Sequence, residues 1–185
     1  MSDFAATALL ERLSRVIHND AHASGLKPTQ WEALRFLARA NRVSRSPGAL
    51  TGFLGVTKGT VSQTLQALER KGLIEKTTAD GDRRGVKLDL TPAGRTLLAD
   101  DPLTDLDASL AAMPPEARDE LSTSLERLMT EMLARRGGRA FGACRTCRHF
   151  TRGHREGAPY FCALLRAPLS RGESEQICIE QETTA

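Results

Sequence analysis

Residues 57–95 constrain the fold of this chain more than any other stretch. They open with an apolar stripe at the spacing of an α-helix, made of Val61, Leu65 and Leu68. Thr57 stands where it can cap that helix, and Gly72 stands where the helix would end. Two segments of strand character, 73–77 and 85–90, follow on either side of a charged turn. This order of helix, strand, turn and strand predicts a winged helix.

The face of the predicted helix opposite the apolar stripe carries polar side chains that are mostly uncharged. Side chains of this kind can form hydrogen bonds to base edges and phosphates, whereas a face that only meets solvent more often carries Glu and Lys. We therefore predict that this face reads a major groove. Its candidate DNA contacts are Thr57, Lys58, Thr60, Ser62, Gln63 and Gln66.

The turn between the two predicted strands carries Asp82, Arg83 and Arg84. Arginine at an extended tip is well placed to enter a narrow minor groove, where the electrostatic potential is most negative. The turn is therefore predicted to contact the minor groove beside the helix. A helix and a basic hairpin at this spacing favour DNA binding over an ordinary helical domain.

Helical periodicity extends on both sides of this stretch, and the fold class is predicted to be mainly α with a small β-wing. The further predicted helices cover about 4–22, a segment from Pro28, 47–54, a segment from Pro92, 103–113 and 117–135. Gly137-Gly138 is predicted to be a linker. These features divide the chain into a DNA-binding and dimerisation domain, 1–136, and a cysteine-rich extension, 137–185.

Charge is unevenly distributed along the chain, whose net charge is +3. Residues 27–95 hold 13 Lys and Arg against 6 Asp and Glu, a balance of +7, which suits a polyanionic partner. No apolar run approaches the roughly 20 residues of a membrane span, and the N-terminus has no signal-peptide pattern. A cytoplasmic location is therefore expected. No nucleophile–base set and no phosphate-binding loop stands out, so an enzyme is not expected.

Three motifs resemble the MarR family of bacterial transcription regulators: GLKPTQWEALRFLA, LGVTKGTVSQTLQALERKGLIEK and DGDRRGVKLDLTPAGR. The resemblance extends in outline over residues 4–135. It implies the topology α1-α2-α3-α4-β-β-α5-α6 and a homodimer joined by its terminal helices, acting at the nucleoid on a pseudo-palindromic operator. Most members are repressors, so repression is expected. The resemblance also implies that Asp82 orients the wing while Arg83 or Arg84 reaches the minor groove, and it allows a small-molecule ligand.

The chain has no cysteine before Cys144 and then four, which are Cys144, Cys147, Cys162 and Cys178. In a reducing compartment this usage indicates metal or redox chemistry more than disulfides. Aromatic residues cluster around the cysteines, and a segment of this size cannot bury an adequate core alone. We therefore predict that the four thiolates form one metal site.

The identity of the metal stays open at this point. The spacing, one CxxC followed by two single cysteines, resembles the ligand layout of high-potential iron–sulfur proteins and favours a [4Fe–4S] cluster slightly. Zinc is the alternative, although zinc ribbons usually show two CxxC pairs. Nitrogen ligation by His149 or His154 is a further possibility. A cluster predicts a redox or iron sensor that acts by loosening an extension of the dimer helices; zinc predicts a structural clamp in a ligand-responsive regulator.

A function of another class competes with the regulator hypothesis. The winged helix could be a dimeric scaffold for protein interaction or electron transfer. Salt dependence distinguishes the two, because DNA binding through phosphate contacts weakens steeply as salt rises.

Overall fold

The structure is a computed structural model that describes residues 3–20, 25–78, 85–138, 141–153 and 157–182. Its helices are α1 (Asp3–Asp20), α2 (Pro28–Arg39), α3 (Pro47–Leu54), α4 (Lys58–Arg70), α5 (Pro92–Leu97), α6 (Thr104–Ala111), α7 (Pro115–Arg135) and α8 (Arg171–Ser174), with 3-10 turns η2 (Leu98–Asp100) and η3 (Cys144–Thr146). Its strands are β1 (Ile74–Thr78), β2 (Val86–Leu90), β3 (Gly142–Ala143), β4 (Phe150–Arg152), β5 (Tyr160–Cys162), β6 (Ala167–Leu169) and β7 (Ile177–Cys178).

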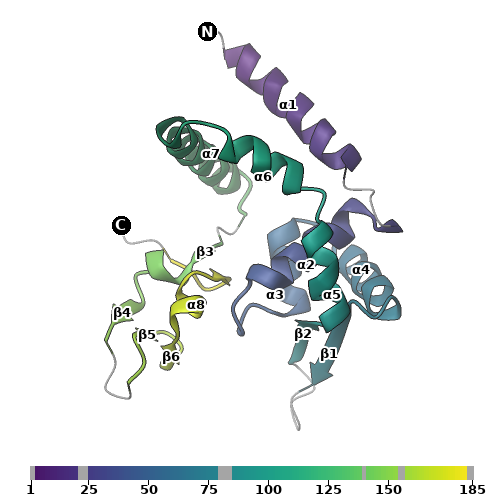
Figure 1. Cartoon of the computed structure of the whole chain (residues 1–185). Helices are drawn as coiled ribbons and strands as arrows, with labels where there is room; N and C mark the ends of the chain where they lie inside the picture. The colour runs from purple at the N-terminus through teal and green to yellow at the C-terminus, as the bar shows by residue number, and fades with distance from the viewer. Residues whose placement is uncertain (1–2, 21–24, 79–84, 139–140, 154–156, 183–185) are drawn as a thin grey trace.

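The main core lies where α2, α3 and α4 pack against the β1–β2 hairpin (Figure 1). The largest fully buried side chains include Trp31, Phe36, Leu50, Leu68 and Leu88. The hairpin is antiparallel, and its register pairs Ile74 with Leu90. The predicted winged helix is thus confirmed. The observed bounds of β1 and β2 differ from the predicted bounds, 73–77 and 85–90, by at most one residue.

The helix boundaries follow local capping chemistry that the sequence predicts. The Thr57 hydroxyl accepts a hydrogen bond from the Thr60 backbone N–H at 3.2 Å, which fixes the start of α4. Gly72 follows α4 in the left-handed region, with φ +69°, and turns the chain into β1. Thr91 caps α5 in the same way as Thr57 caps α4, through the Gly94 backbone N–H at 3.1 Å.

The segment after the wing departs from the topology that the family resemblance implies. The resemblance implies two helices after the wing, whereas the structure has α5, α6 and α7, and residues 101–103 separate η2 from α6. Asp101 has extended backbone angles, because the residue before proline is disfavoured in the helical region. Its carboxylate also accepts the Leu103 backbone N–H at 2.8 Å. The periodicity of 103–113 predicts this separate helix, whereas the family topology does not.

Helices α1 and α7 lie away from the winged-helix core, on the side opposite the wing hairpin (Figure 1). Large apolar side chains on both helices are exposed within the single chain: Leu9, Leu10, Leu13 and Val16 on α1, and Leu125, Leu128, Met129 and Met132 on α7. No described helix is long and apolar enough to span a lipid bilayer.

The cysteine-rich extension folds into a small unit that the sequence does not predict in detail. Strand β3 pairs with β7, and β4, β5 and β6 form a three-stranded antiparallel sheet. The unit packs on the winged-helix core through Phe141, Ile177 and Ile179. Phe141 contacts Phe36 and Phe53 edge-on, with ring centroids 6.3 and 5.3 Å away. The extension therefore folds back beside α2 and α3.

Candidate DNA-binding surface and cysteine site

Helix α4 separates into a buried and an exposed face, as its sequence predicts. Val61, Thr64, Leu65 and Leu68 are buried, whereas the predicted DNA contacts on the helix are all exposed. Thr57 and Thr60 are close enough for their hydroxyls to share a hydrogen bond at 2.9 Å. These two side chains are therefore occupied in capping the helix, although each hydroxyl also keeps capacity for a further contact.

Two surface grooves run beside the exposed face of α4. Lys58 and Ser62 line one of them, together with Thr51 of α3 and Lys76 of β1. Thr60, Gln63 and Gln66 line the other, which is closed by the start of α2. Each groove has a volume of roughly 360–370 Å³. The predicted contacts thus form one ridge between two hollows, which is a shape that can enter a major groove.

The grooves also contain basic and polar residues that the sequence analysis did not single out. Lys76 lines the first groove and forms an ion pair with Glu69 of α4 at 2.6 Å. Lys27 and Thr29 line the second, together with Arg70 from the predicted polar face of the helix. The basic balance of residues 27–95 pointed to this surface only in general, because it does not say which side chains share a face.

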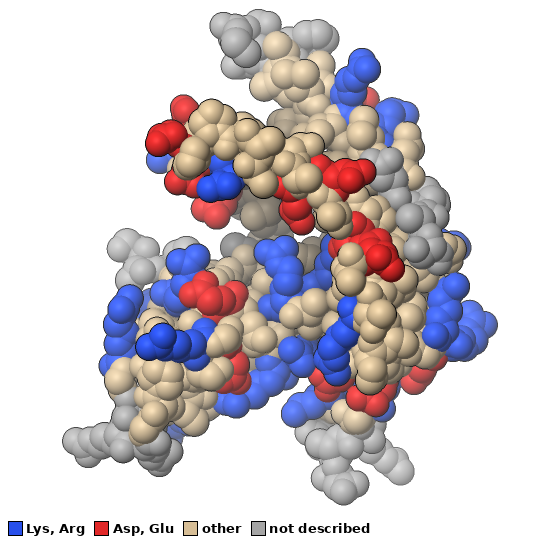
Figure 2. Space-filling view, viewed as in Figure 1, with Lys and Arg blue, Asp and Glu red and all other residues tan. Residues whose placement is uncertain are grey.

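The wing tip residues Asp82, Arg83 and Arg84 lie outside the described residues. The strands that lead to them are described, and they extend from the body of the protein in Figure 1. On the face in Figure 2, acidic side chains gather over α6 and α7, and basic side chains spread over the opposite half of the molecule. Acidic side chains also lie among the basic ones in that half, so the separation of charge on this face is partial.

The four cysteines come from separate elements and line one small cavity. Cys144 begins η3, Cys147 follows it, Cys162 ends β5 and Cys178 lies in β7. Cys144 and Cys178 are buried, and the other two are partly exposed. All four are free thiols. The structure thus brings together residues that are up to 34 positions apart in the sequence, as the hypothesis of a single site requires.

The cavity wall is mostly apolar. Besides the cysteines, it is formed by Phe150, Leu164, Leu165, Leu169 and Glu180. The Phe150 ring packs on Tyr160 with centroids 4.9 Å apart. The cavity volume is about 10 Å³, the space of a single small atom. A hollow of this size cannot hold an iron–sulfur cluster unless the cysteine side chains separate.

Hydrogen-bond donors approach several of the sulfur atoms. The Asn41 side-chain amide donates to Cys144 Sγ at 3.4 Å, and the Glu182 backbone N–H donates to Cys147 Sγ at 3.5 Å. A hydrogen bond from Cys144, together with others from Asn41, the Glu180 backbone and Ser44, lowers the pKa of Cys178 to about 6. The same hydrogen bond and burial raise the pKa of Cys144. The two cysteines are therefore direct neighbours in the cavity.

Four cysteine sulfur atoms are the ligands that a soft, thiophilic metal prefers. In this structure, however, the four side chains are not close enough together to coordinate one ion. Within the described residues, no three Cys, His, Asp or Glu side chains converge closely enough to hold an ion. Binding therefore requires the cysteine side chains to rearrange. His149 does not line the cavity, and its Nε2 lies 3.7 Å from Glu182 Oε1. His154 lies outside the described residues.

The comparisons with known proteins agree with the winged-helix geometry. Residues 24–85 match a family model described as MarR family. No curated protein matches the chain in sequence. Many solved structures match in fold.

A MarR transcriptional regulator from Methanosarcina mazei Go1 is 23% identical, with a TM-score of 0.58 over 72% of this chain and 99% of that one. MepR of S. aureus, solved with DNA, is 18% identical with a TM-score of 0.56, over 70% and 96% of the two chains. FabT of Streptococcus pneumoniae, also in complex with DNA, is 24% identical with a TM-score of 0.55, over 70% and 94%. At these identities the likeness shows a shared fold.

Proposed function

We propose that this chain is a DNA-binding transcription regulator of the MarR type that acts as a homodimer. The observation that carries the proposal is the exposed polar ridge of α4 beside a wing hairpin, in the part of the chain that matches the MarR family model. Two of the structures with the same fold are complexes with DNA. The ridge enters the major groove, and the wing reaches the adjacent minor groove.

The dimer is inferred from the exposed apolar faces of α1 and α7. Eight large apolar side chains on these two helices are between 37% and 62% exposed in the single chain. An exposed apolar surface on this scale marks a protein interface more often than a solvated face. A second copy of the chain, related by a two-fold axis, also supplies the second half-site reader that a palindromic operator needs.

On DNA, the charged and the amide side chains of α4 contact different parts of the duplex. Lys58 contributes a positive charge to the phosphates, which supplies affinity without sequence information. Gln63 and Gln66 carry amides that can pair with base edges, where adenine offers both a donor and an acceptor. An exposed polar ridge of this kind supports a reader of DNA. We expect the regulator to repress its target.

Selection from a random duplex library by the purified full-length protein tests this function. We expect the selected sequences to share a two-fold symmetric motif, and binding to weaken steeply between about 50 and 200 mM salt. Gln63→Ala should change the preferred base at one position in each half-site. The scaffold hypothesis predicts instead no enriched motif and no affinity above that for unrelated duplex, and this result would overturn the proposal.

We further propose that the four cysteines bind a metal centre through their thiolates. Support comes from the small core of the extension, whose buried members among the described residues are Cys144, Leu169 and Cys178. So small a core cannot offset the entropy of ordering some forty residues, and a metal crosslink is the usual means of stabilising such a unit. The N–H groups that point at the sulfurs are the outer contacts that such centres use.

When bound, a zinc ion would crosslink η3, β5 and β7, which carry or adjoin the four cysteines. An iron–sulfur cluster would in addition exchange an electron. Anaerobic purification followed by iron, sulfide and zinc analysis distinguishes the two. About four Fe and four sulfide per chain identify a cluster and a redox sensor. About one Zn per chain identifies a structural centre. Less than about 0.1 equivalent of either, with four titratable thiols, would overturn the metal proposal.

A further inference from the structure

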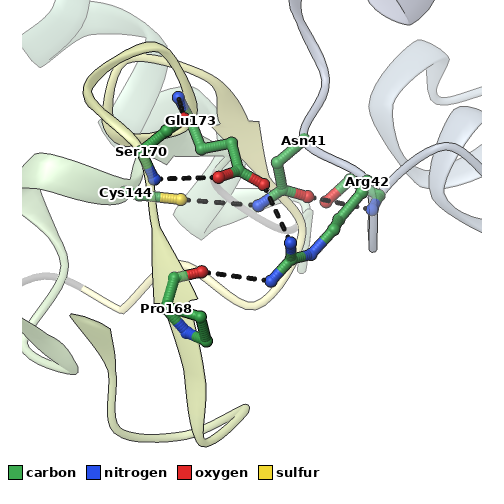
Figure 3. Close-up of polar contacts among 7 residues, drawn as sticks. Asn41, Arg42, Cys144, Pro168, Ser170 and Glu173 are labelled. Atoms are coloured by element: carbon green, nitrogen blue, oxygen red, sulfur yellow. Dashed lines mark hydrogen bonds and ion pairs between the residues drawn. The ribbon is translucent and has the colours of Figure 1, made fainter. Parts of the chain in front are cut away.

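Asn41, in the loop between α2 and α3, is built into the cysteine site although it belongs to the winged-helix unit. It is only 3% exposed. Its side-chain amide donates to Cys144 Sγ at 3.4 Å, and its side-chain oxygen accepts the Ser44 backbone N–H at 3.0 Å (Figure 3). The two ends of one buried side chain thus join a sulfur atom to the backbone of the loop.

Ser44 makes a second connection of the same kind. It is fully buried, and its hydroxyl oxygen accepts the Ile179 backbone N–H at 2.8 Å, next to Cys178. The Asn41 backbone N–H donates to the Ile177 carbonyl at 2.9 Å, and Ala40 pairs with Ile177 in a parallel bridge. The loop therefore contacts both residues that flank Cys178, and through Asn41 it contacts the sulfur of Cys144.

The other end of the loop holds the DNA-reading elements. The Arg45 carbonyl accepts the Leu88 backbone N–H of β2 at 2.9 Å, and the Arg45 guanidinium pairs with Asp89 of β2 at 2.7 Å. Ser46, the next residue, caps α3 by accepting the Ala49 backbone N–H at 3.2 Å. Residues 41–46, here called the connecting loop, thus touch the cysteine site, the wing and the first helix of the helix-turn-helix.

We propose that Asn41 and Ser44 are positioning residues of the cysteine site and that, through the connecting loop, the metal state of that site sets DNA affinity. The inference rests on the metal centre and the DNA-binding function proposed above. It replaces the expectation that the extension prolongs the dimer helices, because the extension folds back onto the connecting loop. The rearrangement of Cys144 and Cys178 on binding metal must move or stiffen Asn41 and Ser44, since Asn41 donates to Cys144 Sγ and the buried Ser44 holds the backbone next to Cys178.

A buried amide donor next to a metal-bound sulfur has a second consequence. An N–H···S hydrogen bond withdraws electron density from the thiolate, so it changes the absorption of the metal–thiolate bond. Loss of the donor therefore has a spectroscopic signature that a purely structural role for Asn41 would not produce. Arg42 offers a matched control. It is the neighbouring residue and joins the extension at the Pro168 carbonyl and Glu173, both at 3.2 Å, without reaching a sulfur (Figure 3).

The test compares the full-length protein as purified with the same protein after its metal is removed by a chelator under reducing conditions. The probe is a duplex selected from a random library by the metal-bound form. For the natural sequence we expect the two forms to differ about tenfold in DNA dissociation constant, within the usual range of coupling between sites. We also expect slower hydrogen exchange across residues 85–90 in the metal-bound form, since the Leu88 amide is held by Arg45.

Asn41→Asp keeps the oxygen that accepts from Ser44 and removes the donor to sulfur. We expect it to reduce the tenfold ratio to below about twofold at full metal occupancy, and to shift the thiolate-to-metal absorption measured with Cd²⁺ as the only metal. Arg42→Gln should keep both the ratio and the absorption. Ser44→Ala is a smaller change and should give a ratio between those of the natural protein and Asn41→Asp. It is the variant to test if Asn41→Asp does not fold.

Equal DNA affinity of the metal-bound and metal-free natural protein would overturn the inference and leave the proposed function intact. Retention of the full ratio of dissociation constants by both Asn41→Asp and Ser44→Ala would also overturn the inference. Loss of that ratio in Arg42→Gln alone would overturn it too, because the docking of the extension would then set DNA affinity in place of the contacts at the cysteine site. A natural protein that binds neither metal nor selected DNA would instead refute the proposed function itself.

Discussion

The Arg35 guanidinium holds the Asp101 carboxylate with two hydrogen bonds, from Nε at 2.7 Å and from Nη2 at 2.6 Å. Both side chains are largely buried, at 18% and 16% exposure. The contact joins α2 of the core to the point at which the chain leaves α5 and η2 for α6. It therefore fixes the direction in which α6 and α7 leave the winged-helix unit.

The Asp101–Arg35 pair predicts a pH dependence of stability. Burial acts to raise the pKa of Asp101, but the hydrogen bonds from Arg35 and Leu103 and the Arg35 charge lower it overall. A lowered pKa adds stability above the unfolded value of about 4, and this contribution is lost as the pH falls through the folded pKa. Asp101→Asn should reduce the free energy of unfolding by about 1–3 kcal/mol at pH 7. Urea titrations should show this difference shrinking below about pH 4, and a constant difference would contradict the pair's role.

Gly94 is predicted to be irreplaceable by alanine because of a close backbone approach. A Cβ at this position would lie 2.1 Å from the Leu73 carbonyl oxygen, which accepts the Thr91 backbone N–H. Gly94→Ala should therefore destabilise the protein by about 1–3 kcal/mol, as overpacking does. Gly59→Ala is the control, since its nearest neighbour would be 3.8 Å away in an exposed helix. Thermal unfolding should show Gly59→Ala unchanged or stabilised, and equal loss in both variants would argue against the clash.

Lys58 is predicted to contact phosphate. Lys58→Ala should weaken binding to all duplexes alike and reduce the slope of log affinity against log salt by about 1. Arg152→Ala removes the same charge from exposed β4 of the extension and should leave the slope unchanged. Fluorescence anisotropy at several salt concentrations measures both slopes. If the two variants behave alike, Lys58 contributes only to net charge.

Leu128 is predicted to lie in the dimer interface. It belongs to the apolar face of α7, where it is 40% exposed in the single chain. Leu128→Glu should shift sedimentation toward the monomer and weaken operator binding, because a charge would have to be buried between the subunits. Thr123→Glu places the same charge on the opposite side of the helix and should remain dimeric. If Leu128→Glu remains dimeric, Leu128 does not lie in the dimer interface.

Cys162 is predicted to be a metal ligand. Cys162→Ser should reduce the metal content of the purified protein to a small fraction and lower the melting temperature of the extension, because a hydroxyl is a poor ligand for a soft metal. Ala163→Ser alters the next, exposed residue and should keep full metal content. Elemental analysis of both proteins measures the metal content. Full metal content in Cys162→Ser would show that Cys162 is not a ligand.

The sequence predicted the winged helix closely because its signals are local. Thr57 and Thr91 as caps, Gly55 and Gly72 as helix ends, and alternating strand residues each act over a few positions. The break at Asp101 was visible in the periodicity but not in the family topology. For the cysteines, the aromatic residues around them and the small size of the segment predicted one site, and the structure places all four around one cavity.

The place of the extension and its contacts could not be predicted, since they depend on pairs far apart in the chain. The Asn41 amide meets Cys144 across 103 positions, and Ser44 meets Ile179 across 135. In the sequence both residues belong to a polar stretch that reads as an ordinary loop. Their burial follows only from the packing of Phe141, Ile177 and Ile179 on the core, which no periodic pattern encodes.

The position of Phe141 bears on how the protein can be dissected experimentally. Its ring covers Gly52 and packs against Phe36 and Phe53, so the extension forms part of the wall of the winged-helix core. A chain shortened to end after α7 would lose this cover and present aromatic surface to water, which favours aggregation. Loss of DNA binding in such a deletion would therefore report a damaged fold. Point changes in the intact chain are the appropriate way to separate the proposed effect of the cysteine site from stability.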